Sequence, residues 1–336
     1  MQRIIIDCDP GNGIAGANTD DGLALALALA SADLQVEMVT TVSGNTPAAT
    51  GARVVTDLVR RCGLTVPVYC GAERALCEPE EEWRRQLDTR VEALSLGYLW
   101  DSVRPPARLS EYPRHAAERM AECICASPGE ITLLALGPLT NIAHALQRFP
   151  KMAGAVAEII IMGGVFHLDD YIKDTNFGLD PEAASLVLNC GAKITLVPMD
   201  VTVNTLLTRK DLQRITAGSS PLALFVRDTL TPWITYSMLT RHPGGSWIHD
   251  VLVVAWLLDP QVATAENFRA GIEIRPGLTR GKSWRYRPPL RVGVGIDPEE
   301  GADIRILTSV DNALLLRLLE RVLSPPAAAD MSRRMS

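Results

Sequence analysis

The stretch RIIIDCDPG, residues 3–11, joins a short apolar strand to a pair of aspartates and a Pro-Gly turn. Its β-branched part, Arg3 to Asp7, predicts a strand, and the Leu- and Ala-rich stretch from Asp20 to Ser31 predicts a helix. A buried strand followed by a helix is the repeating unit of α/β proteins. The start of the chain therefore favours that fold class.

The same alternation continues as far as Pro198. Two further segments have helical spacing, Thr46 to Cys62 and Leu179 to Asn189. The apolar segments that predict strands are Val36 to Val42, Val66 to Cys70, Ile131 to Leu136, Ala157 to Met162 and Lys193 to Pro198. Because these strands are apolar along their whole length, we expect a largely parallel sheet covered by helices on both faces.

Two stretches interrupt this alternation. Residues Glu73 to Pro113 are rich in charge and proline and predict a helical excursion over the edge of the sheet. Residues Gly271 to Leu307 alternate around the turn Pro276-Gly277 and predict an antiparallel addition. We therefore expect one α/β domain with a mostly parallel, Rossmann-like central sheet over residues 1–325, followed by a disordered tail over residues 326–336.

The composition is that of a globular protein. Hydrophobic residues make up 47% of the 336 residues, and the net charge of −6 argues against a nucleic-acid-binding surface, which needs a basic patch. No apolar stretch is long enough to span a bilayer or to form the core of an export signal. Seven scattered cysteines are an odd number, as in chains that keep their thiols reduced. We expect a cytoplasmic protein that binds neither nucleic acid nor membrane.

Carboxylates gather where the first strand ends. Asp7 and Asp9 lie at this end, and Asp20 and Asp21 start the next helix. Ligands of an open parallel sheet bind outside the carboxyl ends of its strands. Helix capping and the helix dipole explain Asp20 and Asp21 but leave Asp7 and Asp9 without a role. Four converging carboxylates repel one another unless a cation neutralises them, and an all-oxygen set suits Ca²⁺ or Mg²⁺ better than zinc.

Seven segments in order resemble the inosine-uridine-preferring nucleoside hydrolase family. The first is the aspartate cluster of residues 7–11 with Asp20-Asp21, which resembles the family's amino-terminal signature. The others are Val42-Ser43-Gly44-Asn45, residues 135–143 (ALGPLTNIA), Ile161-Met162-Gly163-Gly164, residues 176–184 (NFGLDPEAA), residues 197–202 (VPMDVT) and His249-Asp250. Together they extend over roughly residues 3 to 260, which is far more specific than any single motif.

The resemblance implies a role for each matching residue. Asp9, Asp21 and Asp250 match the side-chain ligands of a Ca²⁺ ion, and Leu136 matches a backbone-carbonyl ligand. Asp9 also matches the general base, and His249 lies where some members contact the leaving base. The remaining matches imply substrate binding by Asp20, Asn45, Met162, Asp174 and Asn176. Asp7 is expected to orient the cluster from behind it. The family further implies a ribonucleoside substrate and a homodimer or homotetramer.

Elementary chemistry agrees with these roles. Ca²⁺ accepts six to eight oxygens, so two ribose hydroxyls can complete its coordination. A metal-held water loses a proton more easily, and we expect Asp9 to accept it. Attack at C1′ passes through an oxocarbenium-like state that carboxylates stabilise.

Three features depart from the family pattern. Residues 12–19 separate Gly11 from Asp20, where one residue is usual, and their Gly and Ala content predicts a flexible bulge. Asp174 stands in place of Glu and is one methylene shorter. The segment from Glu78 to Trp100 lacks the family's histidine, so the sequence does not predict which base is cleaved. Aromatic residues between Trp83 and Tyr112 offer a second way to bind the base, beside His249.

Two other functions stay open. A phosphatase of the haloacid-dehalogenase type also ends its first strand in Asp-x-Asp, but it carries Thr or Val two positions after the second Asp, where this chain has Gly11. A non-catalytic nucleoside-binding protein on the same fold is the second alternative, and it would not need to retain the complete ligand set. Release of ribose, release of phosphate, or no turnover distinguishes the three functions.

Overall fold

The strand β1 (Gln2–Cys8) lies in the middle of a sheet, between β2 and β4. The structure is a computed structural model that describes residues 1–77, 82–107, 112–241, 244–297 and 300–324. Successive side chains of β1 enter two different cores. Ile4 and Ile6 face one core, Ile5 faces the other, and all three are fully buried. This explains why the strand is apolar throughout.

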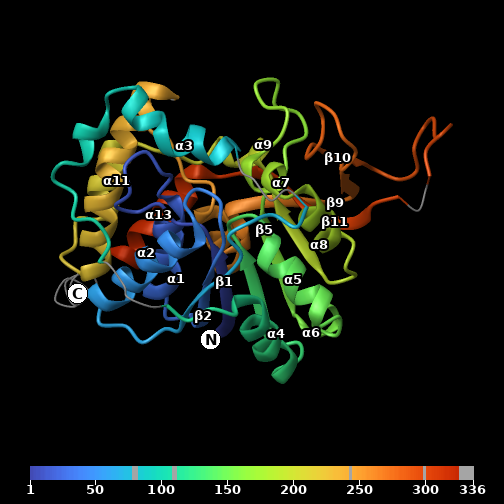
Figure 1. Cartoon of the computed structure of the whole chain (residues 1–336), viewed down its shortest axis with the longest axis horizontal. Coiled ribbons are helices and arrows are strands. Elements are labelled where there is room, and N and C mark those ends of the chain that lie inside the picture. The colour runs from blue at the N-terminus through green and yellow to red at the C-terminus, as the bar shows by residue number, and fades with distance from the viewer. Residues whose placement is uncertain (78–81, 108–111, 242–243, 298–299, 325–336) are drawn as a thin grey trace, which may run out of the picture.

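In the described ranges, nine strands form one sheet in the order β10-β9-β11-β6-β5-β4-β1-β2-β3 (Figure 1). The parallel strands after β1 are β2 (Leu34–Thr41), β3 (Val68–Cys70), β4 (Ile131–Ala135), β5 (Glu158–Met162), β6 (Ile194–Val197) and β11 (Ala302–Val310). The strand β9 (Ala263–Ile272) pairs antiparallel with β11 and with β10 (Ser283–Tyr286). The expected mostly parallel sheet and its antiparallel addition are confirmed.

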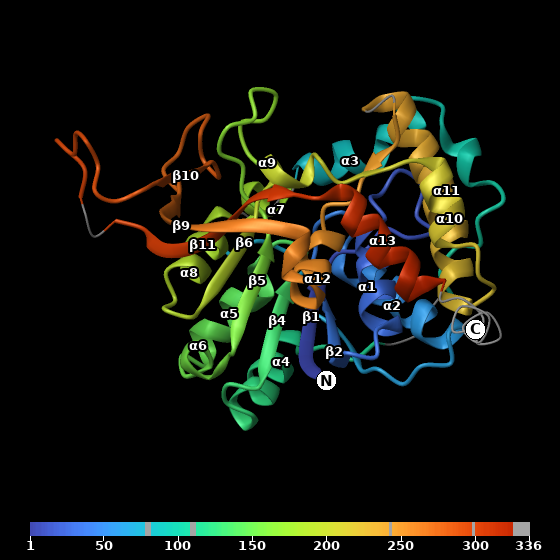
Figure 2. The same ribbon diagram turned by 180° about the vertical axis from the view of Figure 1, so that it is seen from behind.

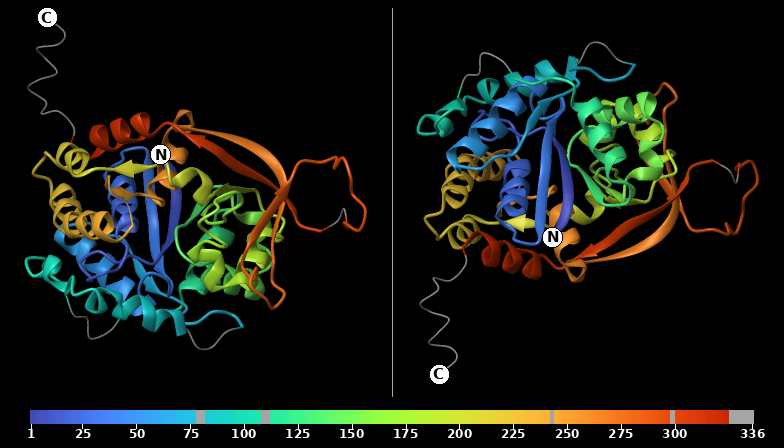
Figure 3. Two further views of the ribbon diagram at one scale, coloured as in Figure 1. Left: turned by 90° about the horizontal axis from the view of Figure 1, so that it is seen from above. Right: turned by 90° about the horizontal axis from the view of Figure 1, so that it is seen from below.

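Helices cover both faces of the sheet (Figures 1 and 2). The core that holds Ile4 and Ile6 is covered by α1 (Asp20–Ala30), α2 (Ala48–Arg61), α10 (Arg209–Ile215), α11 (Pro221–Thr240), α12 (Val251–Leu258) and α13 (Asn312–Leu323). The opposite core is covered by α4 (Ala116–Ala126), α5 (Thr140–Arg148), α6 (Met152–Ala155) and α8 (Pro181–Leu188). Seen from above and below, the two groups of helices flank the central strands (Figure 3).

The remaining described elements are one longer helix and several short segments. They are α3 (Glu82–Ala93), α7 (Thr175–Leu179), α9 (Met199–Thr202), the 3₁₀ turns η1 (Gly97–Trp100) and η2 (Pro260–Val262), and the small ribbon of β7 (Leu206–Leu207) and β8 (Ser246–Trp247). Asp180 caps α8 by accepting the backbone N–H of Ala183 at 3.1 Å, with Pro181 in the first turn. This is the helix start that its sequence predicts.

The predicted helical excursion over residues 73–113 forms, and its helical part packs against α11. Val91 and Trp100 are buried against Trp233 and Tyr236 of that helix. At the edge of the sheet, Tyr112 packs beside Cys70 of β3, and the Pro113 carbonyl accepts the backbone N–H of the same cysteine.

The antiparallel addition starts earlier than Gly271. The register pairs Ala263 of β9 with Val310 of β11. The first half of β9 escaped prediction because its side chains are polar or half-exposed. The expected tail, residues 326–336, lies outside the described ranges. In the part of the chain that the structure describes, no helix has the length and apolarity needed to cross a membrane.

Candidate active site

The predicted site residues gather at the carboxyl ends of the parallel strands. From β1, successive strands run outward in two directions, through β2 and β3 on one side and through β4, β5 and β6 on the other. The sheet therefore has its topological switch point next to β1, where ligands of such sheets bind. Asp9, Asn45, Leu136 and Met162 lie at the carboxyl ends of β1, β2, β4 and β5.

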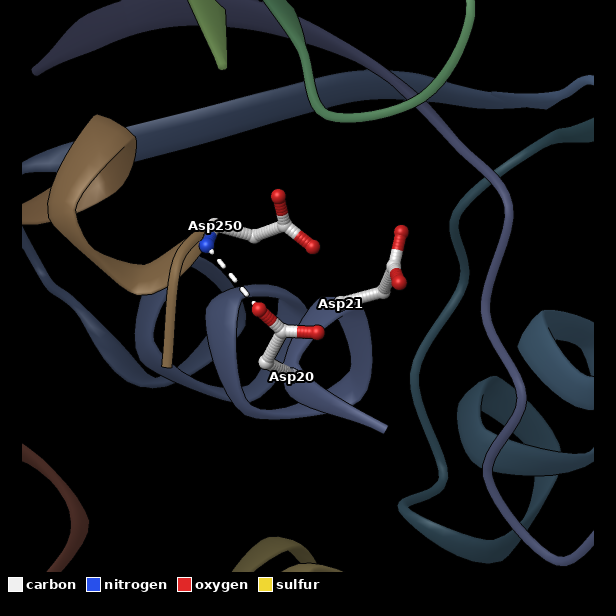
Figure 4. Close-up of side chains that lie close together, drawn as sticks. All are labelled: Asp20, Asp21 and Asp250. Carbon is white, nitrogen blue, oxygen red and sulfur yellow. Dashed lines mark hydrogen bonds between the residues drawn. The ribbon is translucent and has the colours of Figure 1, made fainter. Parts of the chain in front are cut away.

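Three buried carboxylates form a compact cluster at this position. Asp20, Asp21 and Asp250 each offer an oxygen, and these oxygens lie within 4.8 Å of one another. Figure 4 shows Asp20 and Asp21 at the start of α1 and Asp250 at the turn before α12. Asp20, which we expect to contact ribose, lies in this cluster and also lines the cavity. Asp9, an expected ligand, lies beside the cluster, with its backbone N–H on Asp21.

The two helices α1 and α12 explain why carboxylates are tolerated here. Both helices begin at the cluster, and their N-terminal backbone N–H groups favour negative charge. Asp20 accepts the backbone N–H of Asp250 at 3.2 Å, so the first residue of α1 is bound to the residue just before α12. The side chain of Asp250 caps neither helix and points into the cluster.

Burial and mutual repulsion disfavour the ionised state of these groups. Burial raises the pKa of Asp20 to about 7 and that of Asp9 to about 6. Burial first, then the neighbouring carboxylates, raises the pKa of Asp21 and of Asp250 well above the ordinary range. A divalent cation would relieve this repulsion, and the cluster offers only hard oxygen donors.

Asp9 is fixed behind the cluster by backbone contacts. Its backbone N–H donates to Asp21 at 3.0 Å, and its Oδ2 accepts the backbone N–H of Asn45 at 2.5 Å. Its Oδ1 is buried and has no hydrogen-bond partner among the described residues. Two glycines make room for this carboxylate. A Cβ at Gly44 would lie 1.8 Å from Oδ2, and a Cβ at Gly137 would lie 3.0 Å from Oδ1.

Asp7 belongs to the framework of the site. Its Oδ1 accepts Thr40 Oγ1 at 2.5 Å and Asn141 Nδ2 at 2.8 Å. Asn141 also donates to the Thr41 carbonyl at 3.0 Å, so this network joins β1, β2 and α5. Burial raises the pKa of Asp7 to about 7.

Asn176 connects two strand ends through its side-chain amide. Its Nδ2 lies 2.7 Å from the Leu136 carbonyl oxygen and 3.1 Å from that of Met162. A carbonyl oxygen has two lone pairs, so Leu136 keeps one acceptor position for a further ligand.

Asp174 caps α7 by accepting the backbone N–H of Phe177 at 3.0 Å with its Oδ1. Its Oδ2 is buried and unpartnered within the described ranges, and burial raises its pKa to about 6. Asp174, one methylene shorter than the family's Glu, therefore caps α7 with Oδ1, while Oδ2 stays free for a ligand in the cavity that Asp174 lines.

The histidine of the His-Asp pair is held by a threonine. His249 Nδ1 lies 2.6 Å from Thr202 Oγ1, and Thr202 is fully buried. The ring of Trp247 meets that of His249 edge-on at 5.8 Å. These contacts orient the imidazole beside Asp250.

All the predicted site residues except Asp9 and Asp21 line one cavity of about 380 Å³. The two exceptions are fully buried behind it. This volume lies in the ordinary range for a small-molecule site. The cavity residues that sequence reasoning missed are Asn18, Leu87, Arg90, Tyr171, Lys173, Thr175, Met199, Trp233, Ser237, Arg241, Ser246 and Trp247.

The aromatic residues of the cavity come from a later segment than we expected. Trp100 is buried against Tyr236, Tyr98 points to solvent, and Tyr112 packs beside Cys70. None of these three lines the cavity, and the Trp83 side chain lies outside the described part of the chain. Trp233, Trp247 and Tyr171 line it instead.

Residues 12–19 form a packed turn, where the sequence predicted a flexible bulge. Gly11 N–H donates to the Asn18 carbonyl at 2.9 Å and closes the turn. The Asn12 side chain reaches Thr229 of α11 at 3.0 Å. Gly16 lies so close to Val91 of α3 that an added Cβ would be 2.9 Å from Val91 Cβ. The insertion therefore connects β1 to both helices that flank the cavity.

Comparison with known proteins identifies the family. The model of the inosine-uridine preferring nucleoside hydrolase family matches residues 4–317. The pyrimidine-specific ribonucleoside hydrolase RihA of Salmonella typhimurium is 31% identical over 287 residues, which cover 83% of this chain and 86% of that protein. RihA of Escherichia coli is 30% identical with the same coverage.

Solved structures agree. A plant nucleoside hydrolase has a TM-score of 0.80 and 26% identity, with coverage of 97% of this chain and 99% of that one. A purine-preferring ribonucleoside hydrolase from Gardnerella vaginalis shares the fold, with a TM-score of 0.78, 24% identity and coverage of 96% and 98%. The protein is a nucleoside N-glycosidic hydrolase, and the chain belongs to the inosine-uridine preferring nucleoside hydrolase family.

Proposed function

We propose that the protein cleaves the N-glycosidic bond of ribonucleosides to ribose and free base in a calcium-dependent reaction, with Asp9 as general base. The carboxylate cluster of Asp20, Asp21 and Asp250, with Asp9 beside it, is the observation that supports this proposal. The phosphatase and the non-catalytic binding protein are not favoured by the family match.

The donor set fits calcium. Asp9, Asp21, Asp250 and the Leu136 carbonyl would hold the ion, and Asp9 Oδ1 is a buried oxygen without a partner in the described ranges. Asp20 carries a second such oxygen, Oδ1, so it is available either to the ion or to a ribose hydroxyl. When bound, the cation would offset the repulsion among the carboxylates and make a nearby water easier to deprotonate.

Side chains of the protein would carry out the remaining steps, which are proton transfer, orientation of the ribose and stabilisation of charge. The Asp9 carboxylate, whose Oδ2 accepts the backbone N–H of Asn45, takes a proton from water. Asn45, Asn176 and Asp174 lie where they can orient ribose, with Met162 packed beside them. The surrounding carboxylates stabilise positive charge that develops on the sugar.

His249 is the residue that would donate a proton to the leaving base. It lines the cavity next to Asp250, and Thr202 orients its ring. An imidazole is the side chain best matched to donate a proton near neutral pH. We also keep a homodimer or homotetramer and a cytoplasmic location within the proposal, to be tested by light scattering and by fractionation.

A panel of purine and pyrimidine ribonucleosides tests the function, with released ribose as the measured product. Calcium is either added or removed with a chelator. We expect ribose release that depends on calcium. Release of phosphate from phosphate esters, without ribose, would establish the phosphatase. Nucleoside binding with no ribose release would establish a binding protein. Full activity with stoichiometric zinc, or with no metal, would refute the calcium site.

A further inference from the structure

The wall of the active-site cavity carries cations that the reaction at the carboxylate cluster does not use. Arg90, Lys173 and Arg241 line the same cavity as Asp20, Asp174 and Asp250. All three cationic side chains are exposed, whereas the three carboxylates are buried. The carboxylates therefore form the floor of the cavity and the cations form its mouth. A neutral nucleoside has ribose hydroxyls that can bind the carboxylates of the floor. It has no negative group that could pair with the cations at the mouth.

Arg241 is held in a defined position at the end of α11. Its guanidinium carbon lies 5.3 Å from the centre of the Trp233 ring, a cation–π contact. That ring is itself fixed, because Trp233 Nε1 donates to Ser246 Oγ at 3.0 Å and the ring stacks on Tyr236 at 5.5 Å. Within the described ranges, the guanidinium has no carboxylate partner at ion-pair distance. It is a preorganised cation whose hydrogen-bond donors are left for a ligand.

Arg90 is anchored to the same aromatic group. The next residue, Val91, is buried against Trp100, Trp233 and Tyr236, and Gly16 supports it from behind. The surrounding protein removes water from the guanidinium of Arg241, and this lowers its pKa. The positive charge of Arg90 lowers it further. Two like charges directed at one cavity repel each other. That cost is offset when an anion binds between them, and arginine forks suit phosphate and carboxylate.

We infer that this cavity is built for a ribonucleoside that carries an anionic group, phosphate or carboxylate, which Arg90 and Arg241 would bind at the cavity mouth. The inference rests on the proposed nucleoside hydrolysis and specifies its substrate class. The anionic group has two possible sources on a nucleoside: a phosphate on the ribose or a carboxylate on the base. Lys173, next to Asp174, lies on the same rim and adds to the positive potential.

A substrate comparison tests this inference. We would measure kcat/KM of the calcium-loaded enzyme for uridine, for uridine 5′-monophosphate and for orotidine, whose base carries a carboxylate. We expect one of the two anionic substrates to exceed uridine by at least about tenfold, the lower end of what a hydrogen bond to a charged group contributes. The preferred one identifies the source of the charge. The advantage should decrease as salt is added, because the charged rim is exposed.

Variants separate recognition from support of the fold. Arg241→Gln and Arg90→Gln should lose about tenfold more kcat/KM on the preferred anionic substrate than on uridine. Arg85→Gln, on the exposed side of α3 and away from the cavity, is the matched control and should change neither. If Arg241 only stabilises the C-terminal end of α11, its replacement lowers the melting temperature and reduces activity equally on all substrates.

Two negative results are distinguishable. Calcium-dependent turnover of uridine without any preference for the anionic substrates would overturn the inference and leave the proposed function intact. Turnover of none of the three substrates, nor of the wider nucleoside panel, would refute the proposed function itself. An equal loss on all substrates in both arginine variants would also overturn the inference.

Discussion

Replacing Gly44 by alanine tests the position of the Asp9 carboxylate directly. The new Cβ would lie 1.8 Å from Asp9 Oδ2 and 2.6 Å from its Cγ, far inside van der Waals contact. The backbone of Gly44 is not left-handed, so the collision with Asp9 and Pro138 is the main cost. The carboxylate must move by roughly 1 to 2 Å, since a contact distance of about 3.5 Å leaves its Cγ about 1 Å and its Oδ2 nearly 2 Å too close. Asp9 would then lose the hydrogen bond that the backbone N–H of Asn45 donates to its Oδ2.

A displacement of roughly 1 Å at a reacting group can reduce the rate about 100-fold. We therefore expect Gly44→Ala to lower kcat by about two orders of magnitude and to destabilise the protein by about 1–3 kcal/mol, the usual cost of overpacking. Ribose release with saturating calcium gives kcat, and urea unfolding gives the free energy. Gly154→Ala is the matched control. It lies in α6, nothing lies within 4 Å of its added Cβ, and it should keep full activity and stability.

The reasoning would be refuted by a Gly44→Ala enzyme whose kcat stays within threefold of the parent. That result would mean that the Asp9 carboxylate can move without consequence, and Asp9 would not be the general base. A variant that loses stability but keeps kcat would lead to the same conclusion.

Three further predictions concern the chemistry of the site. Asp9→Asn should stay folded and keep less than about one per cent of activity, because an amide cannot accept the proton of water; higher activity in ribose release would contradict the base role. Without metal, the pKa of Asp9 is raised to about 6 and that of Asp20 to about 7, so the stability that these two groups contribute is complete below about pH 4 and is lost as the pH rises through 6 to 7. Calcium should therefore raise the melting temperature more at pH 8 than at pH 5.5, and an equal rise in calorimetry would argue against binding at these carboxylates. His249→Ala should slow natural nucleosides about 100-fold but hardly affect p-nitrophenyl riboside, whose leaving group needs no proton; equal losses on both would contradict the acid role.

Much of the fold could be predicted because its signals are local. The apolar run from Ile4 to Ile6 is buried on both sides, which is readable from the run alone. The carboxylates Asp7, Asp9, Asp20 and Asp21 are close in the sequence, so their convergence on one strand end could be expected.

The parts that escaped prediction depend on long-range contacts. The side chain of Asn12 finds its partner on Thr229, and Gly16 admits Val91, so a Gly-rich loop that predicts flexibility becomes a packed turn. Arg241 carries no local signal at all. Its proposed role depends on the packing of α3 against α11, which places Val91 beside Trp233 and brings Arg90 to the same cavity.

The packed turn of residues 12–19 also bears on the order in which the molecule folds. Asn12 and Thr229 are 217 residues apart in the sequence, and the bond between Asp250 and Asp20 joins residues 230 apart. Closing loops of this length costs chain entropy before any contact repays it, so such pairings form late. The cavity is complete only when α11 and α12 have docked onto β1 and α1. Turnover is therefore a marker of the finished native state, and after denaturation it should return more slowly than the helical signal.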